Sequence, residues 1–389
     1  MAMVRFGDVA ERVNTKEDRF KTDLVYYVGG EHIETGELKV AGRGIIKEAD
    51  LGPMFYFGFK PGDILFVTRN PHLRKSAKVD FAGICSEKTL VIASKDERVL
   101  LQDYLASVMQ SDDFWDFMEE NKSGSVNYFV NWSTLADYEF SLPPLSRQRE
   151  LADLLWAAND LKEAYKKAIT ATDEMLKAKF REMFGEVDDS RGAAERRSKW
   201  PMVELQSVCK TFIDGDWIES KDQSDNGVRL VQTGNVGSCE FINKTDKARW
   251  ISEETFERLK CTEIFEGDIL ISRLPDPIGR ACILPSGLGK AITAVDCTIV
   301  RLNDVVLPKF LIAITESIDY RKQIEQATAG TTRARVSRGS LGKIQIPLPP
   351  LSLQREFVAI ADKAESAKAN LKKSIAAIGQ VMKGLINHG

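Results

Sequence analysis

Two short segments of the chain gather positive charge without any acidic residue. Residues 68–78 (TRNPHLRKSAK) and residues 327–343 (ATAGTTRARVSRGSLGK) each hold four lysines or arginines. The net charge of the whole chain is −3, so these are local patches in a nearly neutral protein. Such patches indicate a site for an anionic ligand such as a phosphate group, while ordinary solvated surface charge is the alternative for any one residue.

Two Pro-Pro pairs invite comparison with the motif by which amino-methyltransferases grip a flipped base. That motif has Asp or Asn before the prolines and an aromatic residue after them, whereas leucines flank both pairs here, namely Leu142, Leu145, Leu348 and Leu351. Residues 286–291 (SGLGKA) lack the first glycine and the final hydroxyl residue of a P-loop. The sequence therefore predicts a non-catalytic protein without a cofactor of its own.

The remaining reactive residue types are scattered along the chain. Asp276 lies between two prolines, as in the start of a nuclease motif, but no Asp/Glu-x-Lys follows at strand spacing, so a turn aspartate is expected. The six cysteines and three histidines form no close pairs, which predicts free thiols and no metal site. No apolar run approaches the roughly 18 residues of a membrane span, and charge comes too early for a signal peptide. A cytoplasmic location is expected.

The elements that position the charged segments come in two copies. LPPLSRQRE at residues 142–150 returns as LPPLSLQRE at residues 348–356, and the strand-like GDIL segments of Asp63 and Asp268 lie at nearly the same offset. Gly124 aligns with Gly330. Because the order of features is the same in both halves, the chain is predicted to contain a duplicated module.

Each Pro-Pro pair is followed by helical periodicity. An apolar residue recurs in a heptad pattern, interrupted at equivalent places by Lys162 and Lys368, and a helix over about residues 147–184 would be on the order of 55 Å long. A face packed on the helix's own module is the alternative for either stripe alone, but two matching helices favour antiparallel pairing. The expected seam residues are Leu151, Leu155, Ala158, Tyr165, Ile169, Leu176, Phe357, Ala364, Leu371, Ile375, Ile378, Met382 and Leu385.

These patterns predict an α+β protein with an internal pseudo-twofold repeat. Two mixed, strand-rich domains would be joined by two long antiparallel, coiled-coil helices. The expected bounds are a first domain at 1–140, a first helical region at 141–185, a linker at 186–199, a second domain at 200–345 and a second helical region at 346–389.

In this order of features the chain resembles the DNA-specificity (S) subunits of type I restriction-modification systems. The doubled LPPL-S-x-Q-R-E with its helix, the doubled GDIL, and residues 329–354 (AGTTRARVSRGSLGKIQIPLPPLSLQ) carry the resemblance, which covers essentially the whole chain. It implies two target-recognition domains, each reading half of a split double-stranded DNA site, and helices that dock two methyltransferase subunits. Restriction and translocase subunits would complete the complex, and S-adenosylmethionine, ATP and magnesium would belong to these partners.

The candidate DNA contacts come from the charged segments and their repeat equivalents. The counterpart of residues 68–78 would be residues 272–280, which share its first arginine, and that of residues 327–343 would be residues 121–132. The copies differ most in these segments, so the two half-sites are expected to differ, with centres about 10 bp apart. The candidates are Arg69, Arg74, Lys75, Lys78, Lys122, Ser125, Asn127, Arg273, Arg280, Thr331, Thr332, Arg333, Arg335 and Arg338.

Two other functions fit the same features. Duplicated modules on a coiled-coil stem could form a non-catalytic scaffold that binds proteins, which the acidic net charge supports. A solitary homodimeric DNA binder without enzyme partners is the second alternative. A neighbouring methyltransferase gene, or a stable complex with its product, would separate these from a specificity subunit.

Overall fold

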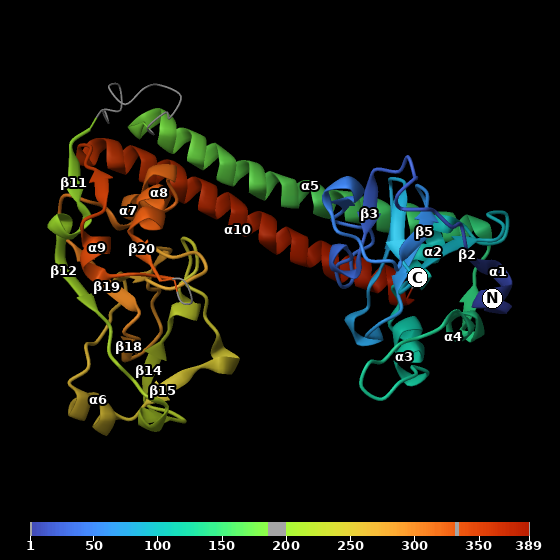
Figure 1. The fold of residues 1–389 in the computed structure, drawn as a ribbon, viewed down its shortest axis with the longest axis horizontal. Coiled ribbons are helices and arrows are strands. Elements are labelled where there is room, and N and C mark those ends of the chain that lie inside the picture. Colours follow the sequence, from blue (N-terminus) through green and yellow to red (C-terminus); the bar gives the residue numbers. More distant parts are fainter. Residues whose placement is uncertain (1, 186–199, 331–333, 389) are drawn as a thin grey trace. The chain divides into compact units, whose positions relative to one another are not determined.

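The computed structural model describes residues 2–185, 200–330 and 334–388 (Figure 1). The chain forms two compact units. Unit 1 comprises Met1–Ala168 and Asn370–Gly389, and unit 2 comprises Ile169–Ala369. Each unit therefore contains one strand-rich part and a segment of both long helices. The expected linker at residues 186–199 lies outside the described residues.

The strand-rich part of unit 1 contains two four-stranded sheets and a two-stranded pairing. The first sheet is antiparallel throughout, with the order β2 (Ala10–Val13), β9 (Thr89–Ser94), β6 (Ile64–Val67) and β7 (Ser76–Lys78). The second has the order β4 (Gly44–Ile45), β3 (Tyr26–Val28), β8 (Gly83–Ser86) and β5 (Phe55–Phe59), with β3 and β8 parallel. β1 (Ala2–Arg5) pairs with β10 (Glu139–Leu142). The helices are α1 (Phe6–Val9), α2 (Gln102–Val108), α3 (Asp112–Glu120) and α4 (Trp132–Asp137).

Unit 2 repeats the order of the antiparallel sheet and three strands of the second sheet, whose fourth strand lies at the opposite edge. Its antiparallel sheet has the order β12 (Cys209–Asp214), β19 (Cys297–Leu302), β16 (Ile269–Ser272) and β17 (Ala281–Ile283). Its second sheet has the order β13 (Gln223–Ser224), β15 (Arg249–Ile251), β14 (Val228–Val231) and β18 (Ala291–Thr293), again with one parallel pair. β11 (Met202–Glu204) pairs with β22 (Gln345–Pro347). The predicted duplication is thus present in the fold.

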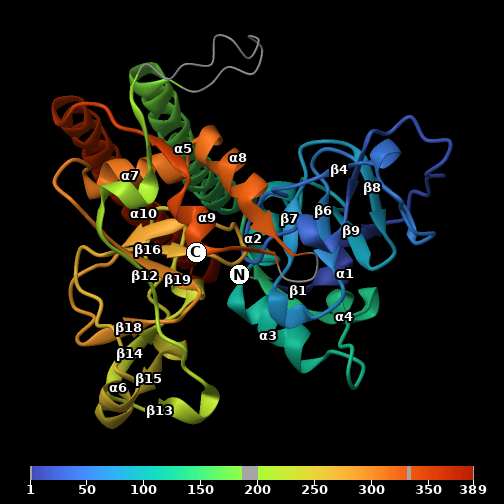
Figure 2. The same ribbon diagram turned by 60° about the vertical axis from the view of Figure 1, so that its left-hand side comes forward.

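The helices of unit 2 lie at both ends of its strand-rich part. α7 (Pro308–Thr315), α8 (Ile318–Ala327) and α9 (Arg338–Gly342) lie near the first sheet, and α6 (Glu253–Leu259) lies beside the second sheet at the other end (Figure 2). A short hairpin of β20 (Thr328–Ala329) and β21 (Arg335–Val336) precedes α9. This hairpin carries the basic segment of unit 2.

The repeated GDIL segment builds the same turn in both units. Gly62 and Gly267 have φ of 98° and 85°, a left-handed conformation that glycine adopts without strain. The buried carboxylates of Asp63 and Asp268 accept hydrogen bonds of 2.9 Å from the backbone N–H groups of Lys60 and Phe265. Both residue types are therefore required by the turn that starts β6 and β16.

The repeated glutamine of LPPL-S-x-Q-R-E is buried in both copies. Gln148 is 1% and Gln354 is 0% exposed. The Gln354 side-chain amide donates to the carbonyls of Val305 and Pro349, and its oxygen accepts from Leu307 N–H, each at 2.9 Å. Gln148 makes the same three bonds, also at 2.9 Å, to Val99, Pro143 and Leu101. One side chain thus ties each long helix to the segment that leads into α2 or α7.

The long helices are α5 (Leu145–Phe184) and α10 (Leu351–His388). Within unit 1, Leu155 of α5 packs in one cluster with Met382 of α10 and Leu38. Within unit 2, Phe180 of α5 packs against Phe357, near the beginning of α10, with ring centroids 5.5 Å apart. Early residues of one helix therefore meet late residues of the other in both units, which confirms the antiparallel arrangement and the α+β class.

All thirteen expected seam residues are buried or half-buried. Phe180 and Phe184 were not among them, yet they form an aromatic cluster with Phe310 and Phe357 in the core of unit 2. Both aromatics lie in the last two turns of α5, past the region where the heptad pattern is regular. The sequence signal for this cluster is the four-residue spacing of Phe180 and Phe184, which places both rings on one face of the helix.

The two lysines that interrupt the seam are both ion-paired. Lys162 Nζ lies 2.6 Å from a carboxylate oxygen of Glu37, which Lys166 also contacts at 3.1 Å. Lys368 pairs with Asp173. Burial raises the pKa of Glu37, but hydrogen bonds and positive charge from the two lysines outweigh burial and bring the pKa below its usual value. Each lysine therefore has a partner that offsets its desolvation.

Candidate nucleic-acid interface

Two segments that are far apart in the sequence meet at one edge of unit 1. Arg69 forms a bridge with Phe129, and Asn70 N–H donates to the carbonyl of Tyr128 at 2.9 Å. Arg69 follows β6, and the loop at 121–130 connects α3 to α4. The structure therefore brings Arg69 together with Lys122, Ser125 and Asn127.

The Arg69 guanidinium is exposed at this edge. It lies 5.0 Å from the Phe129 ring centroid and 3.4 Å from the Asn127 carbonyl. Within the described ranges, no carboxylate lies within ion-pair distance of it. A phosphate or a guanine edge could bind this side chain without displacing an acid, because a guanidinium offers several donors in one plane.

The other candidate residues of this loop differ in whether their side chains already have a partner within unit 1. Ser125 and Asn127 are exposed, and such hydroxyl and amide groups can reach base edges. Lys122 pairs with Glu119 at 2.7 Å and lies 4.5 Å from the Tyr128 ring. Lys122 would have to leave that carboxylate in order to bind DNA.

The later cations of residues 68–78 are engaged within unit 1. Arg74 pairs with Asp112 and, at 3.1 Å, with Asp116, both on α3. The Arg74 hydrogen bond is the main cause that lowers the pKa of Asp112. Lys75 donates to the carbonyl of Gly30 at 2.6 Å, and Lys78 pairs with Asp103. The contacts of these three side chains hold the segment within unit 1.

In unit 2, two arginines of the basic segment lie near aspartates, one on β21 and one at the start of α9. Arg335 is 3.3 Å from Asp296, and Arg338 is 3.7 Å from Asp214. Both arginines remain exposed, so each keeps donors available to a ligand. The candidates Thr331, Thr332 and Arg333 lie outside the described residues.

Arg273 and Arg280 lie in the interior of unit 2, contrary to their expected role as DNA contacts. Arg273 is 2% exposed, donates to the carbonyls of Val295 (2.6 Å) and Val336 (3.5 Å), and pairs with Asp214 at 3.2 Å. The Arg280 guanidinium donates to four backbone carbonyls, those of Val236, Leu274, Pro277 and Thr233. Burial lowers the pKa of both. Both side chains therefore hold backbone segments of unit 2 together, and we leave both residues out of the interface.

The first arginines of the two segments are also not equivalent in the structure. Val130 N–H donates to Thr68 O, and its repeat partner Val336 donates to Arg273 O. Arg273 therefore takes the place of Thr68, and Arg69 corresponds to Leu274. The sequence signal was that Arg273 directly continues the buried strand β16, whereas Arg69 is separated from β6 by one residue.

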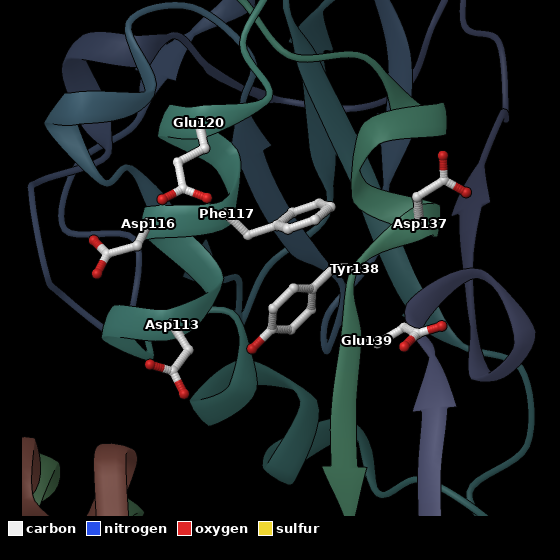
Figure 3. A pocket seen from close by; sticks show the side chains of 7 residues that line it. All are labelled: Asp113, Asp116, Phe117, Glu120, Asp137, Tyr138 and Glu139. Atoms are coloured by element: carbon white, nitrogen blue, oxygen red, sulfur yellow. The ribbon is translucent and has the colours of Figure 1, made fainter.

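An acidic hollow of about 380 Å³ lies between α3 and β10 in unit 1. Figure 3 shows the Phe117 and Tyr138 rings between carboxylates on either side, those of Asp113, Asp116, Glu120, Asp137 and Glu139. Asp116 and Asp137 pair with Arg74 and Arg5, and the negative charge of the other carboxylates at the hollow repels phosphates. DNA is therefore not expected on this face of unit 1.

The six cysteines are free, and four of them are buried; burial raises the pKa of Cys85 to about 12. Within residues 2–185, 200–330 and 334–388, no group of three His, Cys, Asp or Glu side chains could hold a metal ion. Among the same residues, no helix is both long and apolar enough to cross a membrane.

Comparison with known proteins gives consistent matches. Residues 197–380 match the family described as the type I restriction modification DNA specificity domain. The type I restriction enzyme MjaVIII specificity subunit of Methanocaldococcus jannaschii is 20% identical over 390 residues, which cover 94% of this chain and 85% of the relative.

Two solved structures share the fold. One comes from work on complex assembly and conformational transition of the type I R-M system, with a TM-score of 0.58, 19% identity, and coverage of 99% of this chain and 96% of the other. The other is the type I restriction-modification S subunit from M. genitalium, with a TM-score of 0.57, 13% identity, and coverage of 99% and 94%. The duplicated architecture therefore recurs in chains whose sequences differ greatly.

Proposed function

We propose that the chain is a DNA specificity subunit of a type I restriction-modification system, which the match of residues 197–380 to that family supports. It would read a split, asymmetric DNA site with one strand-rich part per half-site. The observation that carries this proposal is the contrast between the two copies. The antiparallel sheet, the GDIL turn and the helix start recur in both copies, whereas the exposed basic loops differ. A repeated frame with unlike contact surfaces is what two different half-sites require.

The reading surface of unit 1 is the edge formed by Arg69 and the loop at 121–130. Arg69 can bind a phosphate or a guanine, and Ser125 and Asn127 can reach base edges in the groove. In unit 2, the corresponding surface is formed by Arg335 on the β20–β21 hairpin and by Arg338 at the start of α9. If DNA phosphates replace the aspartates as partners of these two arginines, the affinity for DNA should be higher at low salt than at high salt.

The chain itself is proposed to be non-catalytic and to act in the cytoplasm, where its DNA is found. Two methyltransferase subunits would dock on its helices, supply S-adenosylmethionine chemistry, and flip the target adenines. Restriction and translocase subunits would bring ATP and magnesium. In unit 1, α5 exposes a stripe suited to a helical partner, formed by Leu154, Ala157, Leu161 and Ala164.

The proposal is tested by selecting DNA from a randomised duplex library with the purified chain. We expect a bipartite, non-palindromic consensus. Arg69→Ala should relax base preference or affinity at one half-site only, and Arg335→Ala at the other half-site only. Arg98→Ala is the matched control, because Arg98 is exposed and pairs with Asp96; it should leave both half-sites unchanged. A palindromic consensus, or no enrichment at all, would contradict the proposal.

A protein-binding scaffold is the second candidate function, and the acidic hollow and the exposed stripe on α5 favour it. A scaffold would bind a protein partner without enriching any DNA sequence. A homodimeric DNA binder would enrich a sequence and yet form no complex with a modification subunit. The selection experiment and a co-purification with that subunit therefore separate the three.

A further inference from the structure

The loop at 121–130 of unit 1, which joins α3 to α4 (Figure 1), carries an exposed valine at its tip. Val126 is 83% exposed, more than any other large apolar side chain among the described residues. Its neighbours Ser125 and Asn127 are exposed polar residues. A single exposed valine is common on protein surfaces, so its surroundings must show whether it has a role.

The backbone on both sides of Val126 is fixed. Ser123 and Phe129 exchange two backbone hydrogen bonds, of 2.8 and 3.0 Å, which close the loop into a short hairpin. Gly124 has a φ of 95°, and a Cβ atom there would lie 2.7 Å from the carbonyl oxygen of Asn127, so the turn requires glycine. The loop therefore presents Val126 to solvent from a defined position.

The same loop is tied to the segment that carries Arg69. Asn70 N–H donates to the carbonyl of Tyr128 at 2.9 Å. The Arg69 guanidinium lies 3.4 Å from the carbonyl of Asn127, the residue that follows Val126. Adjacent Cα atoms are about 3.8 Å apart, so the valine lies close to this arginine. Val126 thus belongs to the surface that is proposed to read DNA.

The polar residues of this surface leave one feature of a base pair unread. Arginine, serine and asparagine bind the hydrogen-bonding groups of base edges, whereas the methyl group of thymine is the apolar feature of the major groove and is recognised by apolar contact. An exposed valine beside those polar groups has the chemistry for that contact. Burial of its methyl groups against the thymine methyl would remove apolar surface of both molecules from water.

We propose that Val126 contacts the methyl group of a thymine in the half-site that unit 1 binds. This inference rests on the proposed function and adds a specificity-determining residue to it. Because Val126 lies close to Arg69, the thymine lies within about two base pairs of the position that Arg69 contacts, given a spacing of about 3.4 Å between successive base pairs. The polar neighbours of Val126 fix the loop on the same stretch of the groove.

Insertion between base pairs is the other use of an apolar side chain in DNA recognition. Such wedges act from the minor groove and are typically Phe, Leu, Ile, Met or Pro. Valine ends one carbon beyond its Cβ atom and has a restricted χ1 angle, so Val126 reaches less far than those side chains. A two-stranded ribbon, which the hairpin resembles, fits the major groove with its width of about 12 Å. Both arguments favour the thymine methyl.

The test uses the purified chain and synthetic duplexes that carry its selected site, in which each thymine in turn is replaced by deoxyuridine. Uracil lacks the methyl group and keeps the O4 acceptor, so the replacement removes the proposed contact from the DNA side. By fluorescence anisotropy, the wild type should bind about 4-fold more weakly when one thymine of the Arg69-dependent half-site is replaced. That factor corresponds to one buried methyl group.

The protein side of the contact is removed by Val126→Ala. This variant should bind the thymine duplex about 4-fold more weakly than the wild type, and it should no longer respond to uracil, because both changes delete the same contact. Val126→Ile keeps a branched apolar side chain and should keep the response. Val99→Ala is the matched control, since Val99 is 45% exposed in unit 1 and lies outside the loop; it should bind both duplexes as the wild type does.

The outcomes separate this inference from the proposed function. A selected site that is bound equally with thymine or uracil at every position would overturn the contact and leave the proposed function standing. The same holds if Val126→Ala responds to uracil as strongly as the wild type. DNA bending that depends on Val126 without any uracil effect, measured by energy transfer between labelled ends, would indicate a wedge and also overturn the contact. A chain that selects no DNA sequence would refute the proposed function and this inference with it.

Discussion

Replacing the buried glutamine at either helix start should destabilise one unit without touching the DNA-binding edge. Gln354→Met keeps the length of the side chain and removes its polar atoms. Leu307 N–H then loses the side-chain oxygen that accepts from it, and the carbonyls of Val305 and Pro349 each lose a donor. Gln148→Met does the same to Leu101, Val99 and Pro143 in unit 1.

The magnitude follows from these three bonds. A buried N–H left without an acceptor costs about 1–3 kcal/mol, and each lost carbonyl bond costs a net of about 1 kcal/mol. The free energy of unfolding of the altered unit should therefore fall by about 3–5 kcal/mol. For a unit of this size, this corresponds to a Tm lower by about 6–20 °C.

Differential scanning calorimetry of the full chain measures this effect. Gln354→Met should shift the transition that contains Ile169–Ala369, and Gln148→Met should shift the transition of the other unit. Gln380→Met is the control, since Gln380 is exposed on α10 and should change stability by no more than about 0.5 kcal/mol. If both glutamine variants have the same Tm values as the Gln380→Met control, then the repeated glutamine does not stabilise the units through these bonds.

Three further outcomes are expected. Phe357→Ala removes a ring from the aromatic core of unit 2 and should cost about 3–5 kcal/mol in urea denaturation; a loss below 1 kcal/mol would contradict the packing. Because the pKa of Glu37 is lowered below 4.5, its contribution to stability is present above that pH and is lost as pH falls through the folded-state pKa, so the difference between wild type and Glu37→Gln should shrink in acid unfolding titrations. Lys162→Met should abolish most of that difference at pH 7. Arg69→Ala should reduce the salt slope of DNA binding by about 0.9 if its contact is a phosphate, and an unchanged slope with altered base preference would indicate a base contact instead.

Much of the architecture follows from the sequence because its signals are local or repeated. The seven-residue spacing in α5 and α10 arises from helix geometry, and the duplicated GDIL and LPPL-S-x-Q-R-E segments each satisfy short-range requirements, a glycine turn and a helix start. These patterns predicted the repeat, the antiparallel helices and the α+β class. The domain bounds derived from them remain predictions.

The contacts of individual cations could not be predicted in the same way. Arg69 and Arg273 both follow apolar strands in basic segments, yet one is exposed beside Phe129 and the other is buried against Asp214. The difference depends on a register shift of one residue and on carbonyls supplied by remote segments.

The sequence by itself determined the duplication and the helices, because backbone propensity and heptad spacing act over a few residues. Only the tertiary structure decided which arginines face solvent, which lysines are neutralised within the fold, and which loop lies beside Arg69. Those outcomes depend on charges and carbonyls from segments that lie from 22 to 195 residues apart in the chain, and no local sequence pattern predicts which of these segments meet.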